Sequence, residues 1–339
     1  MYANSKRLGL VALAGVLTAT AIYFYIDHVR YKAMHAFPPG LFRFDVTAPV
    51  PTCDRWKAHM PKIRDPEPYQ MYIEARNRWR SKIAWQFTKD ELTQILADVR
   101  AASDKGDWGA RALLAHFYLY GLGPLPKNKV LDQDEFKSVA IARMAVEAGQ
   151  PWGYYDVGVA HQYGYGGAYY DWDIAWAYYL RAAELGSPDA QMALAEAYRD
   201  AGRHDAEDKM IRCAYLQGHG PAATLLGRRA RGQSHYMEAL RFHQDAVKFG
   251  SKDSAAHLYL AFGSEAGESQ REGLLTPLGL GIDMERYRRY LEIAEALDLN
   301  PDLRFGRLDL LLPLPPAELP EWRGIQDAMD PDPAGPPSY

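Results

Sequence analysis

Four polar side chains in the middle of the chain are of the types that bind metal ions. His204, Asp205, Glu207 and Asp208 follow one another closely, and imidazole and carboxylate groups are common protein ligands of divalent ions. The segment lies between two predicted helices, where polar side chains are also what a solvated turn requires. A solvated turn is much the commoner use of such residues, and we predict neither a metal site nor a cofactor.

Motifs for catalysis are missing from the rest of the sequence. There is no HExxH, GxSxG or CxxC segment and no P-loop. Gly164-Tyr165-Gly166-Gly167 is rich in glycine, but no strand precedes it and no lysine follows it, so we predict a wide turn inside a helical hairpin. Glu147 and Glu184 recur at equivalent places in two repeats, which favours a structural role over acid–base catalysis. We therefore predict that the protein is not an enzyme.

Cys53 and Cys213 are the only cysteines in the sequence. Cys53 falls in an irregular segment and Cys213 in a predicted helix. One disulfide is possible if the protein folds in an oxidising compartment. Two small buried thiols are the alternative, and the sequence leaves both open.

Aromatic residues are concentrated between Trp152 and Tyr179. Tyr155, Tyr178 and Tyr179 occupy positions that a helical core needs, whereas the turn between them has no such requirement. Exposed Tyr and Trp are typical anchors of protein interfaces, because they combine a large apolar surface with a polar group. Packing over the adjacent repeat is the alternative. We predict a partner-binding surface made of Tyr120, Trp152, Tyr165, Tyr169, Tyr170, Trp172 and Trp176.

The composition is that of an ordinary folded protein. Of 339 residues, 48% are hydrophobic and 24% are charged, which excludes wholesale disorder. The net charge of -4 gives no case for a nucleic-acid partner, which would need a basic face. The length suits a large core, or a solenoid that buries its apolar surface repeat by repeat.

An uncharged apolar run extends from Leu8 to Ile26 and is about as long as a helix that crosses roughly 30 Å of hydrocarbon. A cleavable signal peptide would have a shorter apolar run and a cleavage site of small residues, and no convincing site follows Ile26. We predict a single transmembrane helix. The flanking basic residues give only a weak bias, but the short tail of residues 1–7 is more simply kept in the cytoplasm. The rest of the chain then faces the other side, which for a bacterial inner membrane is the periplasm.

Self-similar segments extend from about residue 106 to residue 298. Four predicted helices end at glycines that are 37, 32 and 32 residues apart, Gly149, Gly186, Gly218 and Gly250. Small residues lie three or four positions from Leu, Tyr and Phe, as in helical hairpins that bury their apolar face by stacking. Ser187-Pro188-Asp189 and Ser251 are placed to begin the helices that follow. We predict about five hairpins.

The segments before the repeats are predicted to be a linker and a cap. Residues 27–67 are rich in proline and read as an extended linker. Residues 68–105 are predicted to form two capping helices, one at about 68–84 and one that begins at Thr88, where Thr88-Lys89-Asp90-Glu91 is a capping box.

The segments after the repeats are predicted to be a strap and a tail. Residues 299–325 carry Pro313, Pro315, Pro316 and Pro320, which impose extended backbone. We predict a strap over the last helical pair, because Leu310 to Leu314 need burial; a proline-rich ligand for a partner is the alternative. Residues 326–339 are predicted to be disordered.

The repeats resemble the Sel1-like family, which is related to tetratricopeptide repeats. Its pattern places Ala, Leu-Gly, Tyr and Gly-x-Gly in and after a first helix and Ala-Ala-Glu-x-Gly at the end of a second. The first half is matched by Ala110, Leu114, Tyr118, Gly121 and Gly123, and the second by Ala175, Tyr178, Tyr179, Ala182, Ala183, Glu184 and Gly186. Leu226-Gly227 and Ala239 to Gly250 match again, whereas the third unit departs from the pattern at 200–208 and the fifth has an insertion at 263–284. The resemblance implies an all-α, right-handed solenoid that binds proteins, here with an N-terminal transmembrane helix.

Two segments near the end, Asn300 to Phe305 and Leu308 to Trp322, resemble bacterial immunity proteins that are paired with type VI secretion lipase effectors of the phospholipase D class. In that family a membrane-anchored protein waits in the periplasm and blocks the toxin. The resemblance implies that a rigid helical surface occludes such an enzyme. A scaffold that organises envelope protein complexes through several weak partners is the alternative function.

Overall fold

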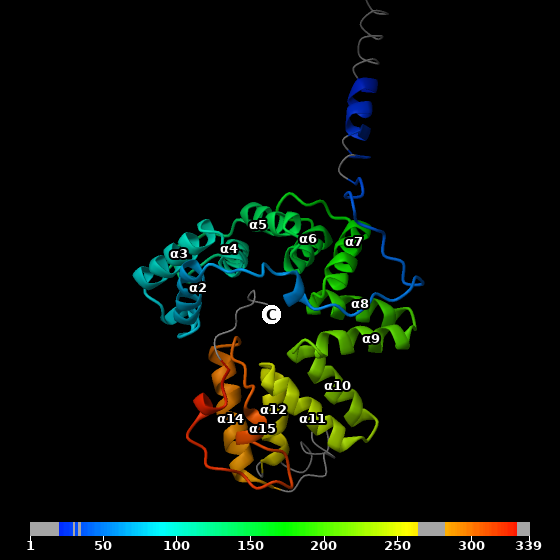
Figure 1. The fold of residues 1–339 in the computed structure, drawn as a ribbon. Helices are drawn as coiled ribbons and strands as arrows, with labels where there is room; N and C mark the ends of the chain where they lie inside the picture. Colours follow the sequence, from blue (N-terminus) through cyan, green and yellow to red (C-terminus); the bar gives the residue numbers. More distant parts are fainter. Residues whose placement is uncertain (1–19, 30, 33–34, 264–281, 331–339) are drawn as a thin grey trace, which may run out of the picture.

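The computed structural model describes residues 20–29, 31–32, 35–263 and 282–330. Its regular structure over these ranges is helical, apart from an isolated bridge between Leu122 and Leu131. Figure 1 shows the helices following one another around an arc. The prediction of an all-α solenoid is confirmed.

Helical hairpins make up the body of the arc, and in the described part of the chain there are five of them. They are α4 (Trp108–Tyr120) with α5 (Glu135–Glu147), α6 (Pro151–Tyr163) with α7 (Trp172–Glu184), α8 (Pro188–Asp200) with α9 (His204–Tyr215), α10 (Gly220–Gly232) with α11 (Tyr236–Lys248), and α12 (Lys252–Phe262) with α14 (Met284–Leu299). The two helices ahead of them are α2 (Pro66–Trp79) and α3 (Lys89–Asp104), which pack on each other and on α4. Most of the insertion expected at 263–284 lies outside the described residues.

Helix boundaries follow from local chemistry. The four repeat glycines have φ values of +71°, +89°, +86° and +82°, which an L side chain adopts only with strain. Ser187 and Ser251 each accept a hydrogen bond from a backbone N–H in the first turn of α8 and α12. The capping box between Thr88 and Glu91 is formed at the start of α3.

An ion-pair network joins the two ends of the arc. The Nε atoms of Arg76 in α2 and of Arg80 just after it lie 2.7 and 3.0 Å from Oδ2 of Asp302, which follows α14. Arg76 is 1% exposed and Asp302 is 5% exposed, so these charges are removed from water and depend on each other. The contact joins residues more than two hundred positions apart and brings the cap beside the last hairpin.

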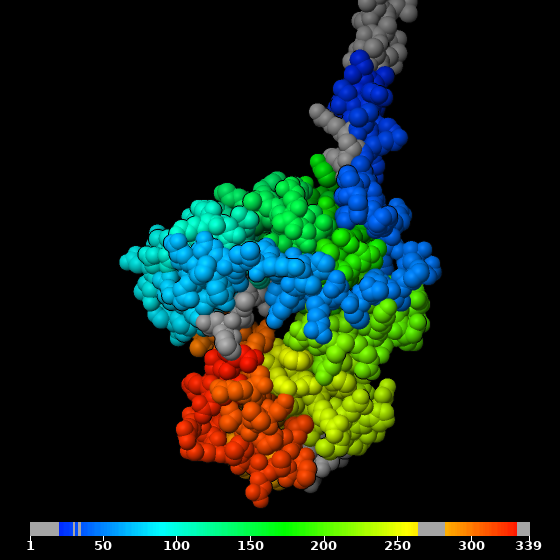
Figure 2. Space-filling model, in the orientation of Figure 1, coloured from blue at the N-terminus to red at the C-terminus, as the bar shows by residue number. Residues whose placement is uncertain are grey.

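The proline-rich linker is not a free tether, because residues 44–64 pack along the solenoid. Figure 2 shows this blue segment crossing the visible face of the molecule. Arg203 in the turn before α9 donates hydrogen bonds to the carbonyl oxygens of Val46 and Ala48. Trp56 lies in the short 3-10 helix η1 (Trp56–His59) and is buried against Trp108.

Cys53 and Cys213 form a disulfide, with Cα atoms 5.2 Å apart and 160 residues of sequence separation. Of the two possibilities that the sequence left open, the bonded pair is the one found. The bond ties the linker covalently to α9, beside the hydrogen bonds that hold the same segment.

The segment predicted to be a strap packs against the last hairpin. Leu308 and Leu312 are fully buried, and Arg286 and Arg289 of α14 donate hydrogen bonds to carbonyl oxygens of the strap. Leu310 lies in the short helix α15 (Leu308–Leu311) and is 72% exposed, so the expectation that it needs burial is wrong.

The tail expected to be disordered from residue 326 is ordered at its start. Ala328 follows the 3-10 helix η3 (Ile325–Asp327) and is fully buried, and the N–H of Asp330 donates to the carbonyl oxygen of Arg304. Residues 331–339 of the predicted tail lie outside the described residues.

The predicted transmembrane helix lies largely outside the described residues, which begin at residue 20. Residues 20–29 are helical. Among the helices that the structure does describe, none is long and apolar enough to span a membrane.

Candidate protein-binding surface

Two adjoining grooves lie along the first helices of successive hairpins. The small groove has a volume of about 400 Å³ and lies among α4, α5 and α6, with Arg80 and Tyr165 at its margins. The large groove has a volume of about 760 Å³ and lies among α6, α7, α8, α9 and α10. Tyr155 of α6 lines both. The helical period of α6 explains this position, because residues three and four apart, such as Trp152, Tyr155 and Asp156, share one face.

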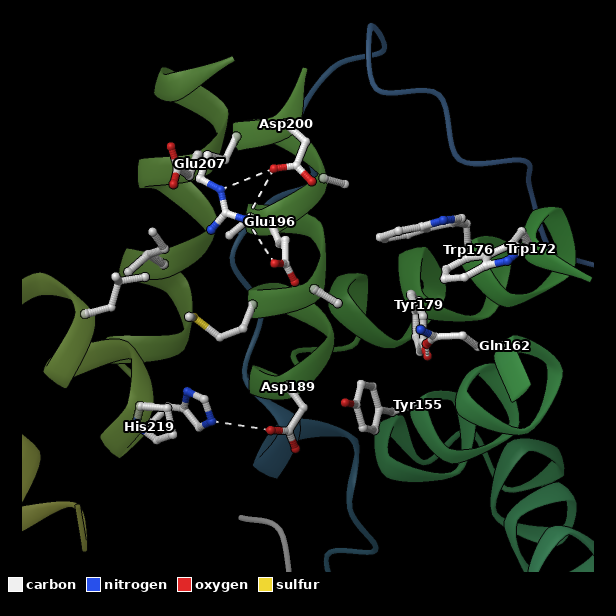
Figure 3. Close-up of a pocket in the computed structure, with 18 of the residues that line it drawn as sticks. Tyr155, Gln162, Trp172, Trp176, Tyr179, Asp189, Glu196, Asp200, Glu207 and His219 are labelled. Atoms are coloured by element: carbon white, nitrogen blue, oxygen red, sulfur yellow. Dashed lines mark hydrogen bonds and ion pairs between the residues drawn. The ribbon is translucent and has the colours of Figure 1, made fainter. Parts of the chain in front are cut away.

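The large groove is rich in carboxylates. Asp189, Glu196, Asp200 and Glu207 line it, against one guanidinium, that of Arg199. Arg199 lies 2.9 Å from Glu196 and 3.2 Å from Asp200 and is shared between them (Figure 3). An electronegative groove favours positively charged partners and speeds their association.

Asp189 at the start of α8 has an incomplete set of partners. Its Oδ1 lies 3.4 Å from Nε2 of His219, and Figure 3 shows the hydroxyl end of Tyr155 directed toward the same carboxylate. Its Oδ2 and the Nδ1 of His219 are both buried and have no hydrogen-bond partner. Burial, followed by the charges of Asp189 and Asp156, raises the pKa of Tyr155, so this hydroxyl stays protonated.

Two ionisable groups of the small groove, Asp156 and His116, have shifted pKa values that decide their charge near neutral pH. Burial raises the pKa of Asp156 to about 7, with Asp189 adding to the effect. Burial, followed by the nearby charge of Arg80, lowers the pKa of His116 to about 4. At neutral pH the imidazole is therefore neutral and cannot balance the carboxylate.

The predicted aromatic surface is divided between the grooves and their surroundings. Tyr169 and Tyr170 lie in the turn before α7 and are 47% and 62% exposed, and neither lines a groove. Trp172 is 43% exposed, donates a hydrogen bond to the Tyr170 hydroxyl at 2.6 Å, and borders the large groove. Trp176 is half-buried, borders the same groove and stacks on Phe44 of the linker.

Of the other predicted residues, Tyr120 is 70% exposed and Tyr165 is half-buried, and both line the small groove. Trp152 is only 2% exposed, and its Nε1 donates to Gln150 at 2.5 Å. It packs in a core cluster with Trp56 of the linker. Trp152 also lines the small groove, but its burial beside Trp56 leaves almost none of it accessible to a partner.

The polar segment at 204–208 is helical rather than a turn. His204 begins α9 and the preceding turn is limited to residues 201–203. Glu207 is 3% exposed and forms ion pairs with His204 and Arg229. No group of His, Cys, Asp and Glu side chains suited to a metal ion occurs among the residues that the structure describes.

Asp156, Asp189 and His116 are the groove residues that sequence reasoning missed. The abundance of aromatic residues indicates the turn before α7, whereas the grooves lie along the first helices of the hairpins. The available signal was the spacing within α6, where Asp156 shares a face with Trp152 and Tyr155 and interrupts an otherwise apolar stripe.

Comparisons with known proteins connect this architecture to immunity proteins. Residues 254–337 match a domain of unknown function (DUF6396), and no curated protein matches the chain. The Pseudomonas aeruginosa protein PA5086 is similar with a TM-score of 0.63 and 26% identity, over 79% of this chain and 96% of that chain. The immunity proteins Pa5087 and PA5088 of the same organism are each 25% identical over 78% of this chain and 94% of theirs, with TM-scores of 0.62 and 0.60. The resemblance to immunity proteins that the sequence indicates is confirmed.

Proposed function

We propose that this chain is an immunity protein that neutralises a toxin by binding it, without chemistry of its own. The observation that carries the proposal is the similarity to two proteins described as immunity proteins, which extends over 94% of their length. Two pre-formed grooves beside exposed aromatic side chains supply a surface on which a partner can dock. An inhibitor of this kind needs only to cover an active site.

The toxin in this proposal is a type VI secretion lipase of the phospholipase D class, met in the periplasm by a membrane-anchored inhibitor. The segments Asn300 to Phe305 and Leu308 to Trp322 support the toxin class through their family resemblance. The disulfide between Cys53 and Cys213 supports an oxidising compartment, since such bonds are rare in the cytosol. The length of the uncharged apolar run from Leu8 to Ile26 supports the anchor.

Co-expression tests the proposal. A type VI secretion lipase of the phospholipase D class is directed to the periplasm of a test bacterium, with and without this chain, and growth and complex formation are measured. We expect protection together with a one-to-one complex whose dissociation constant is roughly nanomolar, as for interfaces of standard size. Absence of both protection and a complex would contradict the immunity function. A complex without protection would favour the scaffold.

A variant series tests whether the turn aromatics contribute to the interface. Replacement of Tyr169, Tyr170 and Trp172 by Ala should weaken the complex by at least tenfold, because exposed anchors of this type are each sometimes worth about 2 kcal/mol. Trp85→Ala is the matched control, since Trp85 is 58% exposed and lies outside both grooves. Equal affinities for the triple variant and the control would show that the turn is not part of the interface.

A further inference from the structure

The carboxylate of Asp156 lacks a positive partner. It is half-buried in α6, lines the small groove, and has no ion pair or hydrogen bond to another described residue. Arg80, the guanidinium at the same groove, is engaged by Asp302. A carboxylate that is partly removed from water and has no positive partner is stabilised when a cation is supplied.

A second acidic group nearby is also unsatisfied. The Oδ2 atom of Asp189 is buried without a hydrogen-bond partner. The neighbouring His219 side chain is 9% exposed, lines the large groove, and leaves its Nδ1 without a partner. Buried polar atoms of folded proteins are nearly always hydrogen-bonded, so the Asp189 carboxylate and the His219 ring have unused capacity to accept hydrogen bonds.

Aromatic rings lie between and around the two carboxylates. Tyr155 lines both grooves, and Tyr120 and Tyr165 line the small one. The faces of such rings attract cations, and a carboxylate among aromatic rings is a recurrent setting for ammonium and guanidinium groups. Glu196 and Asp200 share the single guanidinium of Arg199, so the large groove adds net negative charge.

We propose that these grooves receive a basic side chain, preferentially an arginine, that the partner protein presents to Asp156 and Asp189 beside the ring of Tyr155. Arginine fits better than lysine because its planar group carries five N–H donors and can serve two carboxylates while it stacks on a ring. That the side chain belongs to a toxin rests on the proposed function. The binding of a free guanidinium group in these grooves is independent of the proposed function.

The ionisable groups that face Asp156 come from several elements. Asp189 lies on α8, His116 and Tyr120 on α4, Arg80 after α2, and Tyr165 in the turn before α7, with His219 beside Asp189. His116 is neutral above about pH 4, since its pKa is lowered to that value. Asp156 must lose its proton to attract a cation, so binding should strengthen as the pH rises through about 7.

Titration of the full chain with N-acetyl-arginine amide tests the proposal without a partner. N-acetyl-citrulline amide is the neutral probe of the same shape. We expect a dissociation constant on the order of millimolar for the arginine probe, with up to about thirtyfold tightening from pH 5.5 to 8.5, which is the change in the ionised fraction of a group with a pKa near 7. Equal binding of the two probes, or no binding of either, would overturn the proposal.

Asp156→Asn is the decisive variant, because it keeps the shape of the side chain and removes the charge. It should weaken binding of the arginine probe at pH 8.5 by at least tenfold and reduce the pH dependence. Asp132→Asn is the matched control, since Asp132 is an exposed carboxylate of the loop after α4 whose side chain is 84% exposed. Circular dichroism establishes that both variants are folded. Equal binding by Asp156→Asn and the control would overturn the proposal.

Binding to the lipase used in the co-expression test then separates this inference from the proposed function. If Asp156→Asn binds the lipase at least tenfold more weakly than Asp132→Asn does, the partner supplies the basic side chain. If both variants bind the lipase as tightly as the wild type, the assignment to the partner is overturned while the immunity function stands. If the wild type does not bind the lipase at all, the proposed function fails, and the probe titration still decides whether the grooves form a cation site.

Discussion

Reduction of the disulfide between Cys53 and Cys213 should measure how strongly the linker stabilises the solenoid. The bond joins residues 160 positions apart. The loop-closure model assigns a cross-link over that length an upper value of about 5 kcal/mol at 25 °C, because it restricts the unfolded chain. Contacts that persist in the unfolded chain reduce the effect. We expect reduction to lower the free energy of unfolding by about 2–4 kcal/mol.

Urea unfolding followed by circular dichroism, with and without a phosphine reductant, gives this difference. The chain has only these two cysteines, so the reductant can act at no other bond. The double variant with Ser at both positions is the matched control. It should unfold at the midpoint of the reduced wild type and should not respond to the reductant. Coincident unfolding curves for the oxidised and reduced wild type would refute the reasoning.

Two further substitutions test the contacts that shape the arc. Asp302→Asn leaves Arg76 and Arg80 without their carboxylate and should lower the free energy of unfolding by about 3 kcal/mol. Burial alone would raise the pKa of Asp302, but the two arginines lower it below its ordinary value. The stabilisation by Asp302 is therefore present above the ordinary carboxyl pKa and is lost as the pH falls through the lowered pKa of the folded state. Urea unfolding should accordingly show a smaller difference between wild type and variant at pH 3 than at pH 7. Gly186→Ala should destabilise the protein by at least about 1 kcal/mol more than Gly149→Ala in thermal melts. Both glycines have positive φ, but a Cβ at Gly186 would lie 2.5 Å from the linker backbone, whereas a Cβ at Gly149 would meet nothing within 4 Å. Equal losses of stability for the two variants would show that the linker backbone moves to accommodate the added Cβ.

Features set by neighbouring residues could be predicted from the sequence. The repeat glycines, the serine caps and the capping box at Thr88 each depend on a few adjacent residues, and the structure has them where the pattern places them. The path of the linker depends on contacts with residues far along the chain. A proline-rich composition predicts extended backbone but not the surface on which Trp56 packs. The near-complete burial of Trp152 beside Trp56 could not be predicted for that reason.

The candidate site likewise has residues that the sequence could single out and residues that it could not. Aromatic residues are conspicuous in composition, so the exposed Tyr169 and Tyr170 could be singled out from the sequence. The importance of Asp156 depends on what surrounds it in three dimensions, since an aspartate is ordinary in a helix and only burial raises its pKa to about 7. Residues distant in the sequence create that burial, and no local sequence pattern predicts which residues they are.

Arg80 takes part both in the ion pair that joins the two ends of the arc and in the lining of the small groove. This arginine lines the groove, and its Nε lies 3.0 Å from Oδ2 of Asp302, so the carboxylate that joins the ends of the arc already engages the charge of Arg80. Asp302→Asn would free Arg80 to neutralise Asp156, and it should weaken binding of the arginine probe as well as the fold. Reduction of the disulfide acts at α9, on residues that do not line the small groove, and should lower stability while probe binding per folded molecule stays unchanged. Undiminished binding by folded Asp302→Asn would show that Arg80 does not reach Asp156 when it is released.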